Sequence, residues 1–84
     1  MIASKQPSHI LDITEEVCPF TFVHTKLLME RLTPGEIAEI RLNAGEPLIN
    51  VPRAIEEQGD RVLRLIPEDE SRPEGIHRLW VEKA

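Results

Sequence analysis

Cys18 is the only cysteine of this 84-residue chain, and Pro19 follows it directly. Apolar residues with helical spacing then run to Leu32, and proline is favoured at the first position of a helix. We therefore expect Cys18 to lie just before a helix N-terminus. There the helix dipole and the free N–H groups of Phe20 and Thr21 would favour a thiolate, which is the nucleophilic form of cysteine. This arrangement indicates a reactive thiol.

A structural role for Cys18 stays open, because free cysteine is among the residues most often buried in protein cores. The carboxylates of Glu15 and Glu16 lie within three residues of it and disfavour a thiolate by like-charge repulsion. They either point into solvent, where ionic screening weakens them, or select a basic partner. In both cases the local sequence makes Cys18 the first residue to test.

Two cations are candidates for the rim of such a site. Lys26 lies two turns into the predicted helix, and Arg53 belongs to a second predicted helix. Either could attract an anion or a partner's acidic surface. The alternative for each is an ordinary solvated side chain on a helix.

The predicted first helix carries two apolar stripes. One stripe is expected to face a sheet and comprises Phe22, Thr25, Leu28, Met29 and Leu32. The second stripe, formed by Phe20, Val23 and Leu27, is either a rim where partner proteins dock or a surface packed against the second helix. Alanine at Phe20 separates these possibilities, because a docking residue affects partner affinity as well as stability.

The chain reads as an α/β (α+β) protein with the element order β-α-β-α-β-β. Strands are predicted at 9–13, 36–42, 61–66 and 76–83, and helices at 19–32 and within 48–58, with Pro52 starting or bending the second. Two helices on one face of a four-stranded mixed sheet give a two-layer sandwich. We expect a flexible N-terminal tail over residues 1–8, a single domain over 9–84, and a mobile acidic loop over 67–75.

Composition argues against several classes of function. The net charge of −5, with ten scattered basic residues, disfavours nucleic acid and anionic membrane as partners. No apolar run approaches the ~20 residues that span a bilayer. A lone cysteine allows no internal disulfide, which fits the cytoplasm, and neither the cysteine nor the three histidines have metal-ligand spacing.

Two motifs carry a resemblance to a known family. The segments 11-LDITEEVCP-19 and 34-PGE-36 match the pattern of the TusA/SirA-like sulfur carriers, including Leu11, Asp12, Cys18, Pro19 and, within the helix, Lys26. Val51-Pro52 stands at the Ile-Pro of the family. The segments 18-CPFTFV-23 and 45-GEPLINVPR-53 are similar to a subgroup with a C-P-x-T motif.

The resemblance implies a sulfurtransferase that holds sulfane sulfur as a persulfide on Cys18, without a cofactor. Pro19, Phe20, Thr21 and Lys26 would support the thiolate or persulfide. The implied partners are a sulfur donor, such as a cysteine desulfurase or a rhodanese-like protein, and a sulfur acceptor. Glu15, Glu16 and Thr21 depart from the family pattern, so a non-catalytic interaction module with the same fold stays open.

Overall fold

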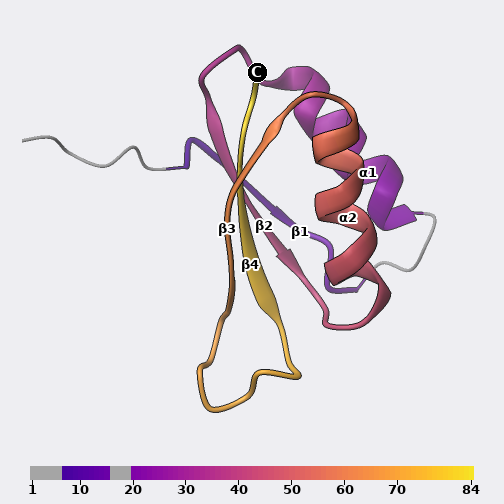
Figure 1. Cartoon of the computed structure of the whole chain (residues 1–84), viewed down its shortest axis with the longest axis vertical. Coiled ribbons are helices and arrows are strands. Elements are labelled where there is room, and N and C mark those ends of the chain that lie inside the picture. Colours follow the sequence, from indigo (N-terminus) through magenta and orange to yellow (C-terminus); the bar gives the residue numbers. More distant parts are fainter. Residues whose placement is uncertain (1–6, 16–19) are drawn as a thin grey trace, which may run out of the picture.

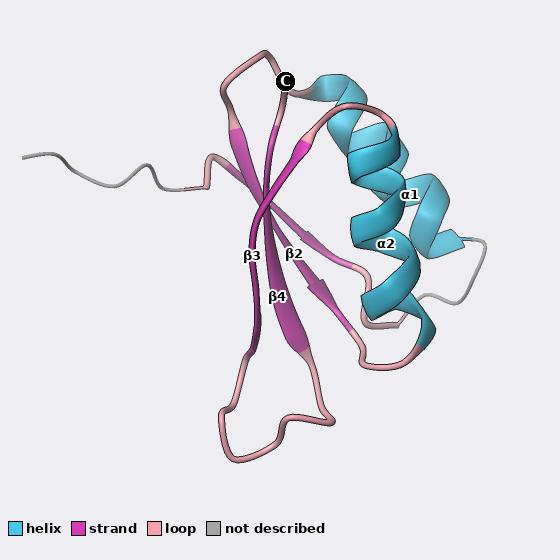
Figure 2. Cartoon of the chain, viewed as in Figure 1, coloured by secondary structure: helices cyan, strands magenta, loops and turns pink. Residues whose placement is uncertain are grey.

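The computed structural model describes residues 7–15 and 20–84, without the side chains of Phe20 and Thr21. Four strands form one layer and two helices form the other (Figures 1 and 2). This confirms the predicted two-layer architecture and its element order. The elements are β1 (His9–Asp12), α1 (Phe20–Arg31), β2 (Ile37–Leu42), α2 (Glu46–Glu57), β3 (Arg61–Pro67) and β4 (His77–Glu82).

The sheet is mixed and has the strand order β1-β2-β4-β3. β1 and β2 are parallel, whereas β4 is antiparallel to both β2 and β3. The first three strands therefore run in the same direction, and each helix returns the chain along the sheet between two of them (Figure 1). As a result, both helices begin at the end of the sheet that holds the C-terminal ends of β1 and β2.

A turn after α1 ends the helix as the sequence predicts. Gly35 has a φ of 92°, a conformation that glycine adopts without the steric cost of a side chain. The Glu36 carboxylate accepts a hydrogen bond of 2.8 Å from the backbone N–H of Thr33. The N–H of Gly35 also bonds the carbonyl of Lys83 at 2.8 Å, so the turn is joined to the end of β4.

α2 begins two residues before the predicted range of 48–58. Gly45 precedes it with a φ of 100°, and Pro47 lies in its first turn. Proline is tolerated there because the first N–H groups of a helix have no intrahelical partner, so Gly45 and Pro47 are compatible with the start of a helix. Pro52 lies inside the helix, which continues past it. Val51 and Ile55 are only 1% and 2% exposed, and their burial in the core favours the helix on both sides of Pro52.

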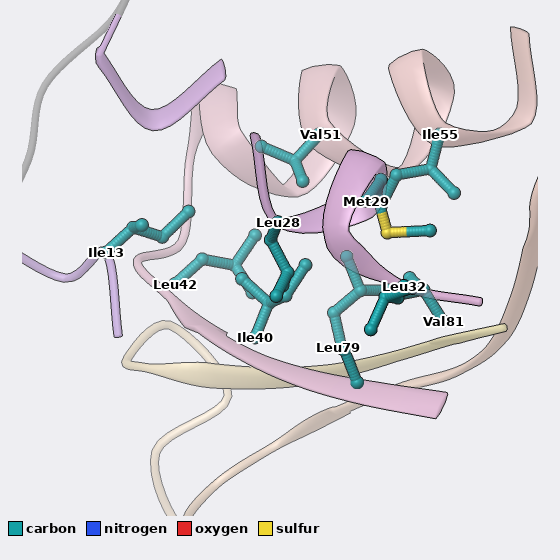
Figure 3. Close-up of a cluster of buried hydrophobic side chains, with 11 residues drawn as sticks. Ile13, Leu28, Met29, Leu32, Ile40, Leu42, Val51, Ile55, Leu79 and Val81 are labelled. Carbon is teal, nitrogen blue, oxygen red and sulfur yellow. The ribbon is translucent and has the colours of Figure 1, made fainter. Parts of the chain in front are cut away.

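The core lies between the helices and the sheet (Figure 3). Its largest members come from both layers, and Thr25, Leu28, Met29 and Leu32 of α1 are buried as predicted. Phe22 is an exception, because it stays 41% exposed and lines a groove between α1 and α2. The side chains of the core cluster are Ile13, Leu28, Met29, Leu32, Ala38, Ile40, Leu42, Val51, Ile55, Leu79 and Val81.

Candidate functional site

The predicted nucleophile lies between two described segments. Cys18, Pro19 and Glu16 fall outside the described residues. The structure does describe the turn that ends at Glu15 and the helix that begins at Phe20. The site is therefore characterised by these two flanks.

The first flank is a hydrogen-bonded turn after β1. The Asp12 carboxylate accepts bonds from the backbone N–H of Thr14 at 2.9 Å and from its hydroxyl at 2.6 Å. Such bonds from an aspartate to a residue two positions ahead are a common way of forming a turn. The backbone N–H of Ile13 bonds the carbonyl of Arg41 at 3.0 Å. The chain is thus held against β2 just before the cysteine motif.

Asn43 adds a side-chain contact to this turn. Its amide nitrogen donates a hydrogen bond of 2.5 Å to the carbonyl of Thr14. Asn43 follows the end of β2, so this bond joins the two loops that lie at the same edge of the sheet. A carboxylate at this position could not donate the bond. Glu15, the next residue along the chain, is exposed.

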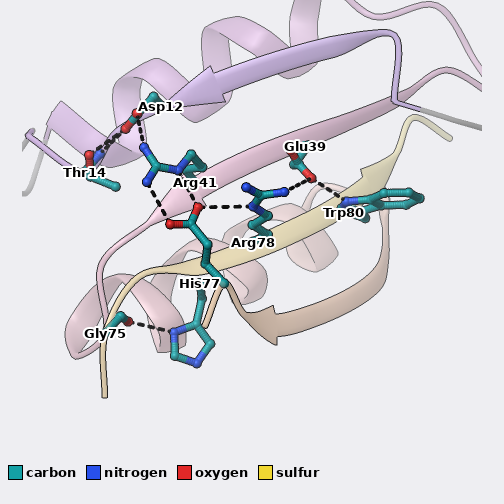
Figure 4. A network of polar contacts seen from close by, with 9 residues as sticks. Asp12, Thr14, Glu39, Arg41, Gly75, His77, Arg78 and Trp80 are labelled. Atoms are coloured by element: carbon teal, nitrogen blue, oxygen red, sulfur yellow. Dashed lines mark hydrogen bonds and ion pairs between the residues drawn. The ribbon is translucent and has the colours of Figure 1, made fainter. Parts of the chain in front are cut away.

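A chain of ion pairs extends from Asp12 across the outer face of the sheet (Figure 4). Arg41 contacts Asp12 at 2.6 Å and holds both carboxylate oxygens of Glu68, at 2.7 and 3.0 Å. Arg78 donates to the same Glu68 at 3.1 Å. These contacts connect the end of β1 to the loop between β3 and β4. We call Asp12, Arg41, Glu68 and Arg78 the outer-face network.

The acidic members of the outer-face network are ionised at neutral pH. Hydrogen bonds from Thr14, with a further contribution from Arg41, lower the pKa of Asp12 to about 2. Hydrogen bonds from Arg41 and then Arg78 lower the pKa of Glu68 to about 2. Hydrogen bonds to Glu68 and then to Asp12 raise the pKa of Arg41, so its charge is also retained.

The outer-face network was not predicted from the sequence. The sequence feature that points to this network is the alternation of charged and apolar residues in the strands. This alternation shows which charged side chains meet only when the strand register is known. In that register Asp12 lies opposite Arg41, and Arg41 lies opposite Arg78. Glu68 belongs to the predicted mobile acidic loop, yet Arg41 and Arg78 hold its side chain.

The second flank is the N-terminal turn of α1. The described helix has no acidic residue in this turn, in contrast to α2, whose first turn contains Glu46. The first N–H groups of any helix lack intrahelical partners and carry partial positive charge. The start of α1 can therefore stabilise an anion, and no carboxylate within its own first turn competes for that charge.

The two candidate cations lie on different helices. Lys26 is exposed and borders the groove between the helices, which Phe22, Met29 and Ala54 also line. Arg53 is exposed on α2 and does not line this groove. A shared rim formed by both cations therefore stays a prediction.

The second apolar stripe of α1 faces solvent where it is described. Val23 is 44% exposed and Leu27 is 47% exposed. Neither side chain is therefore buried between the helices. Their exposure is compatible with docking of a partner, which stays a prediction, as does the role of Phe20.

The described residues contain no group of three or more His, Cys, Asp or Glu side chains that could hold a metal ion. Within the same part of the chain, neither helix is long and apolar enough to cross a membrane. Trp80 lies on the outer face of the sheet, and its indole N–H donates to Glu39 at 2.9 Å (Figure 4).

Comparison with known proteins gives the family. Residues 9–83, which include all the strands and helices of the described residues, match the family described as "Sulfurtransferase TusA". The chain belongs to this family. This confirms the resemblance inferred from the cysteine motif and the PGE turn, whereas the relation to the C-P-x-T subgroup stays a prediction.

Two relatives of this TusA-family chain have informative names. A protein of Archaeoglobus fulgidus named "Putative sulfur carrier protein" is 41% identical over 58 residues, which are 69% of this chain and 66% of the relative. A protein of Thermotoga maritima with the same name is 31% identical over 64 residues, which are 76% of this chain and 81% of the relative. The match thus spans just under two thirds of the Archaeoglobus protein.

Proposed function

We propose that this TusA-family protein is a sulfur carrier that holds sulfane sulfur as a persulfide on Cys18. The Cys18 thiolate attacks the outer sulfur of a donor persulfide, R–S–SH. A new S–S bond forms on Cys18, the S–S bond of the donor breaks, and the donor leaves as a thiolate that takes up a proton. An acceptor nucleophile then removes the outer sulfur and regenerates the Cys18 thiolate. The sulfur moves at constant oxidation state, so no external oxidant or cofactor is needed.

The observation that carries this proposal is the start of α1 two residues after Cys18. The first N–H groups of a helix have no intrahelical partner, and no acidic residue lies in the first turn of α1. Such a position lowers the pKa of a cysteine and raises the fraction of thiolate. Membership of the TusA family and the names of the two relatives support the same chemistry.

We assign supporting roles to residues beside Cys18. We propose that Pro19 favours the start of the helix and that Phe20 and Thr21 supply N–H groups for the thiolate or persulfide. Lys26 would attract the anionic persulfide or an acidic partner surface. We further propose Glu15, Glu16, Val23, Leu27 and Arg53 as contacts with donor and acceptor proteins. Glu15, Val23, Leu27 and Arg53 are exposed, and Glu16 lies outside the described residues.

The proposed partners are a persulfide donor of the cysteine desulfurase or rhodanese-like type and a sulfur acceptor protein. We propose a cytoplasmic location, because a reducing compartment keeps the single thiol available between transfers. The proposed domain spans residues 9–84, and residues 1–8 are proposed to form a tail.

The test is the pH dependence of alkylation of Cys18 by iodoacetamide, followed by mass spectrometry. We expect an apparent pKa clearly below the ~8.5 of a free cysteine. Incubation with a persulfide donor should add the mass of one sulfur atom, and a reducing agent should remove it. Cys18→Ser is the matched control and should gain no sulfur.

Two results would contradict the proposal. One is a thiol that titrates above the ordinary value, and the other is a thiol that reacts only after the protein unfolds. Either would favour a non-catalytic interaction module, which would tolerate Cys18→Ser and lose partner binding only when its surface is changed.

A further inference from the structure

Thr14 lies four residues before Cys18, and side chains from two parts of the chain hold its polar groups. Its backbone N–H and its hydroxyl donate to the Asp12 carboxylate at 2.9 and 2.6 Å. Its carbonyl accepts the hydrogen bond of 2.5 Å from the Asn43 amide. The turn before the cysteine motif therefore has two anchors, one from β1 and one from the loop after β2.

The two anchors hold different parts of Thr14. The bonds to Asp12 involve its N–H and its side chain, so they hold the residue against the end of β1. The Thr14 carbonyl belongs instead to the planar peptide group that also contains the N–H of Glu15. The bond from Asn43 therefore fixes the orientation of this peptide group, and with it the direction in which the chain leaves Thr14 toward residues 15–19.

Asn43 donates this bond from a rigid part of the sheet. It directly follows Leu42, the last residue of β2, whose side chain is fully buried. Beside Thr14, Ile13 is 1% exposed, and its backbone N–H bonds the carbonyl of Arg41 on β2. Side chains supported by strands hold a geometry more precisely than side chains on loops. The end of β2 can thus impose a direction on the chain at Thr14.

Residues 15–19 connect this turn to α1, which is also held by the core. Thr25, Leu28 and Met29 of α1 are 3%, 9% and 2% exposed. The partial positive charge at the start of a helix falls off within about one turn. The share of this charge that a thiolate receives therefore depends on how the chain approaches the helix, and that approach begins at Thr14.

We propose that Asn43 is a positioning residue for the Cys18 thiolate. By holding the Thr14 carbonyl, it directs the chain so that the thiolate meets the free N–H groups at the start of α1. Asn43 acts through Thr14 and takes no part in the transfer of sulfur. The inference rests on the proposed role of Cys18, and it extends the determinants of that site to a residue after β2.

The amide of Asn43 suits this role better than a carboxylate. An amide nitrogen donates to a carbonyl and carries no charge, whereas an ionised carboxylate has no proton to donate. A carboxylate at this position would also add a negative charge to the turn that contains Glu15. Like charge near a thiol raises its pKa, because it disfavours the thiolate. Alanine and aspartate at position 43 therefore separate loss of the bond from the added charge.

The test measures the rate of alkylation of Cys18 by iodoacetamide against pH in the full-length protein and in Asn43→Ala. We expect the apparent pKa of Cys18 to rise toward the ~8.5 of a free cysteine. Alkylation at pH 7 should be about threefold slower, and the rate at high pH, where both thiols are ionised, should be unchanged. Asn43→Asp should raise the pKa at least as far. The ¹⁵N amide signals of Thr14 and Glu15 should shift in both variants.

Two further variants separate positioning from a general loss of stability. Asn50→Ala replaces the other asparagine of the chain, which is exposed on α2, and should leave the pKa of Cys18 unchanged. Trp80→Phe removes a hydrogen bond on the outer face of the sheet and should also leave this pKa unchanged. Circular dichroism and the unfolding temperature check that each variant remains folded.

Two outcomes would overturn the inference alone. One is a pKa of Cys18 that is low in the unchanged protein and equally low in Asn43→Ala. The other is a similar rise in Asn50→Ala or Trp80→Phe, because the effect would then not depend on the bond to Thr14. A thiol that titrates at or above the ordinary value in the unchanged protein contradicts the proposed function itself, and this inference with it, so the two failures are distinguished.

Discussion

The two faces of the sheet are built from different interactions. On the inner face of β4, Leu79 and Val81 are fully buried against the helices. On the outer face of the same strand, Arg78 and Trp80 lie in a layer of ion pairs and hydrogen bonds that no helix covers (Figure 4). Burial of apolar surface is the dominant stabilising contribution, whereas exposed ion pairs contribute little. The inner face therefore sets the stability, and the outer face orders loops at the edge where α1 begins.

The outer face is more ordered than its exposure suggests. Glu39 accepts a bond from Trp80 at 2.9 Å and lies 3.9 Å from Arg78. The guanidinium of Arg64 lies 5.3 Å from the centre of the Trp80 ring, within the range of a cation–π interaction. Polar contacts thus join β2, β4 and β3 on this face, whereas dense apolar packing joins the sheet to the helices on the other.

The largest effect is expected on the inner face. Leu79→Ala removes a fully buried side chain and leaves a cavity, which costs about 2–5 kcal/mol of unfolding free energy. Urea denaturation followed by circular dichroism measures the loss. Arg78→Ala, the neighbouring outer-face residue, is the matched control and should cost far less. Equal losses for the two variants would show that the faces do not differ as described.

A smaller effect is expected from Trp80→Phe. This change keeps a large aromatic side chain but removes the hydrogen bond to Glu39, which should lower the unfolding free energy by about 0.5–1.5 kcal/mol. Thermal unfolding measures the change. Glu39→Gln keeps an acceptor for the indole N–H and should cost less than Trp80→Phe. A cost above that of Leu79→Ala would place the main stabilising contacts on the outer face.

A still smaller effect is expected where Arg64 covers the indole. Arg64→Gln removes the cation over the ring, and an exposed cation–π contact contributes roughly 0.5–1 kcal/mol. Because Trp80 is the only tryptophan, its fluorescence reports this contact directly. We expect a changed emission spectrum together with a small decrease in thermal stability. An unchanged spectrum would contradict the stacking of Arg64 on Trp80.

The smallest effect at neutral pH is expected for Arg41→Gln, but this effect depends on pH. In the folded protein the pKa of Glu68 is lowered to about 2 from the usual 4.5, mainly by Arg41. Its ionised form therefore stabilises the fold above about pH 5, and this contribution is lost as the pH falls toward 2. The ionised form of Asp12 also stabilises the fold, and this contribution is likewise lost as the pH falls, although Thr14 is the main cause of its lowered pKa. The variant should show a weaker loss of stability between pH 5 and pH 2.

The measurement is the midpoint of urea unfolding at several values of pH in this range. Arg61→Gln is the control, because Arg61 lies on β3 outside the outer-face network and should leave the dependence unchanged. A pH dependence that is equal in Arg41→Gln and in the unchanged protein would show that Arg41 does not hold Glu68 ionised.

Local patterns predicted most of the fold. The proline and glycine after α1 mark its end, and alternation of apolar residues locates the strands, because these signals depend on a few neighbouring residues. The start of α2 was missed, since glycine and proline are typical both of turns and of helix starts. The burial of Phe22 was overestimated, because the helical period does not say whether a side chain meets the sheet or the gap beside α2.

The sequence by itself determined the family, the element order and the residue to test first, because the cysteine motif and the PGE turn are short segments with fixed spacing. Tertiary structure decided which distant residues meet. Arg41 reaches Asp12 and Glu68, and Leu27 faces a groove beside β1, because β2 lies between β1 and β4 in the sheet. Strand order and register depend on the simultaneous packing of both layers, and no single segment encodes them.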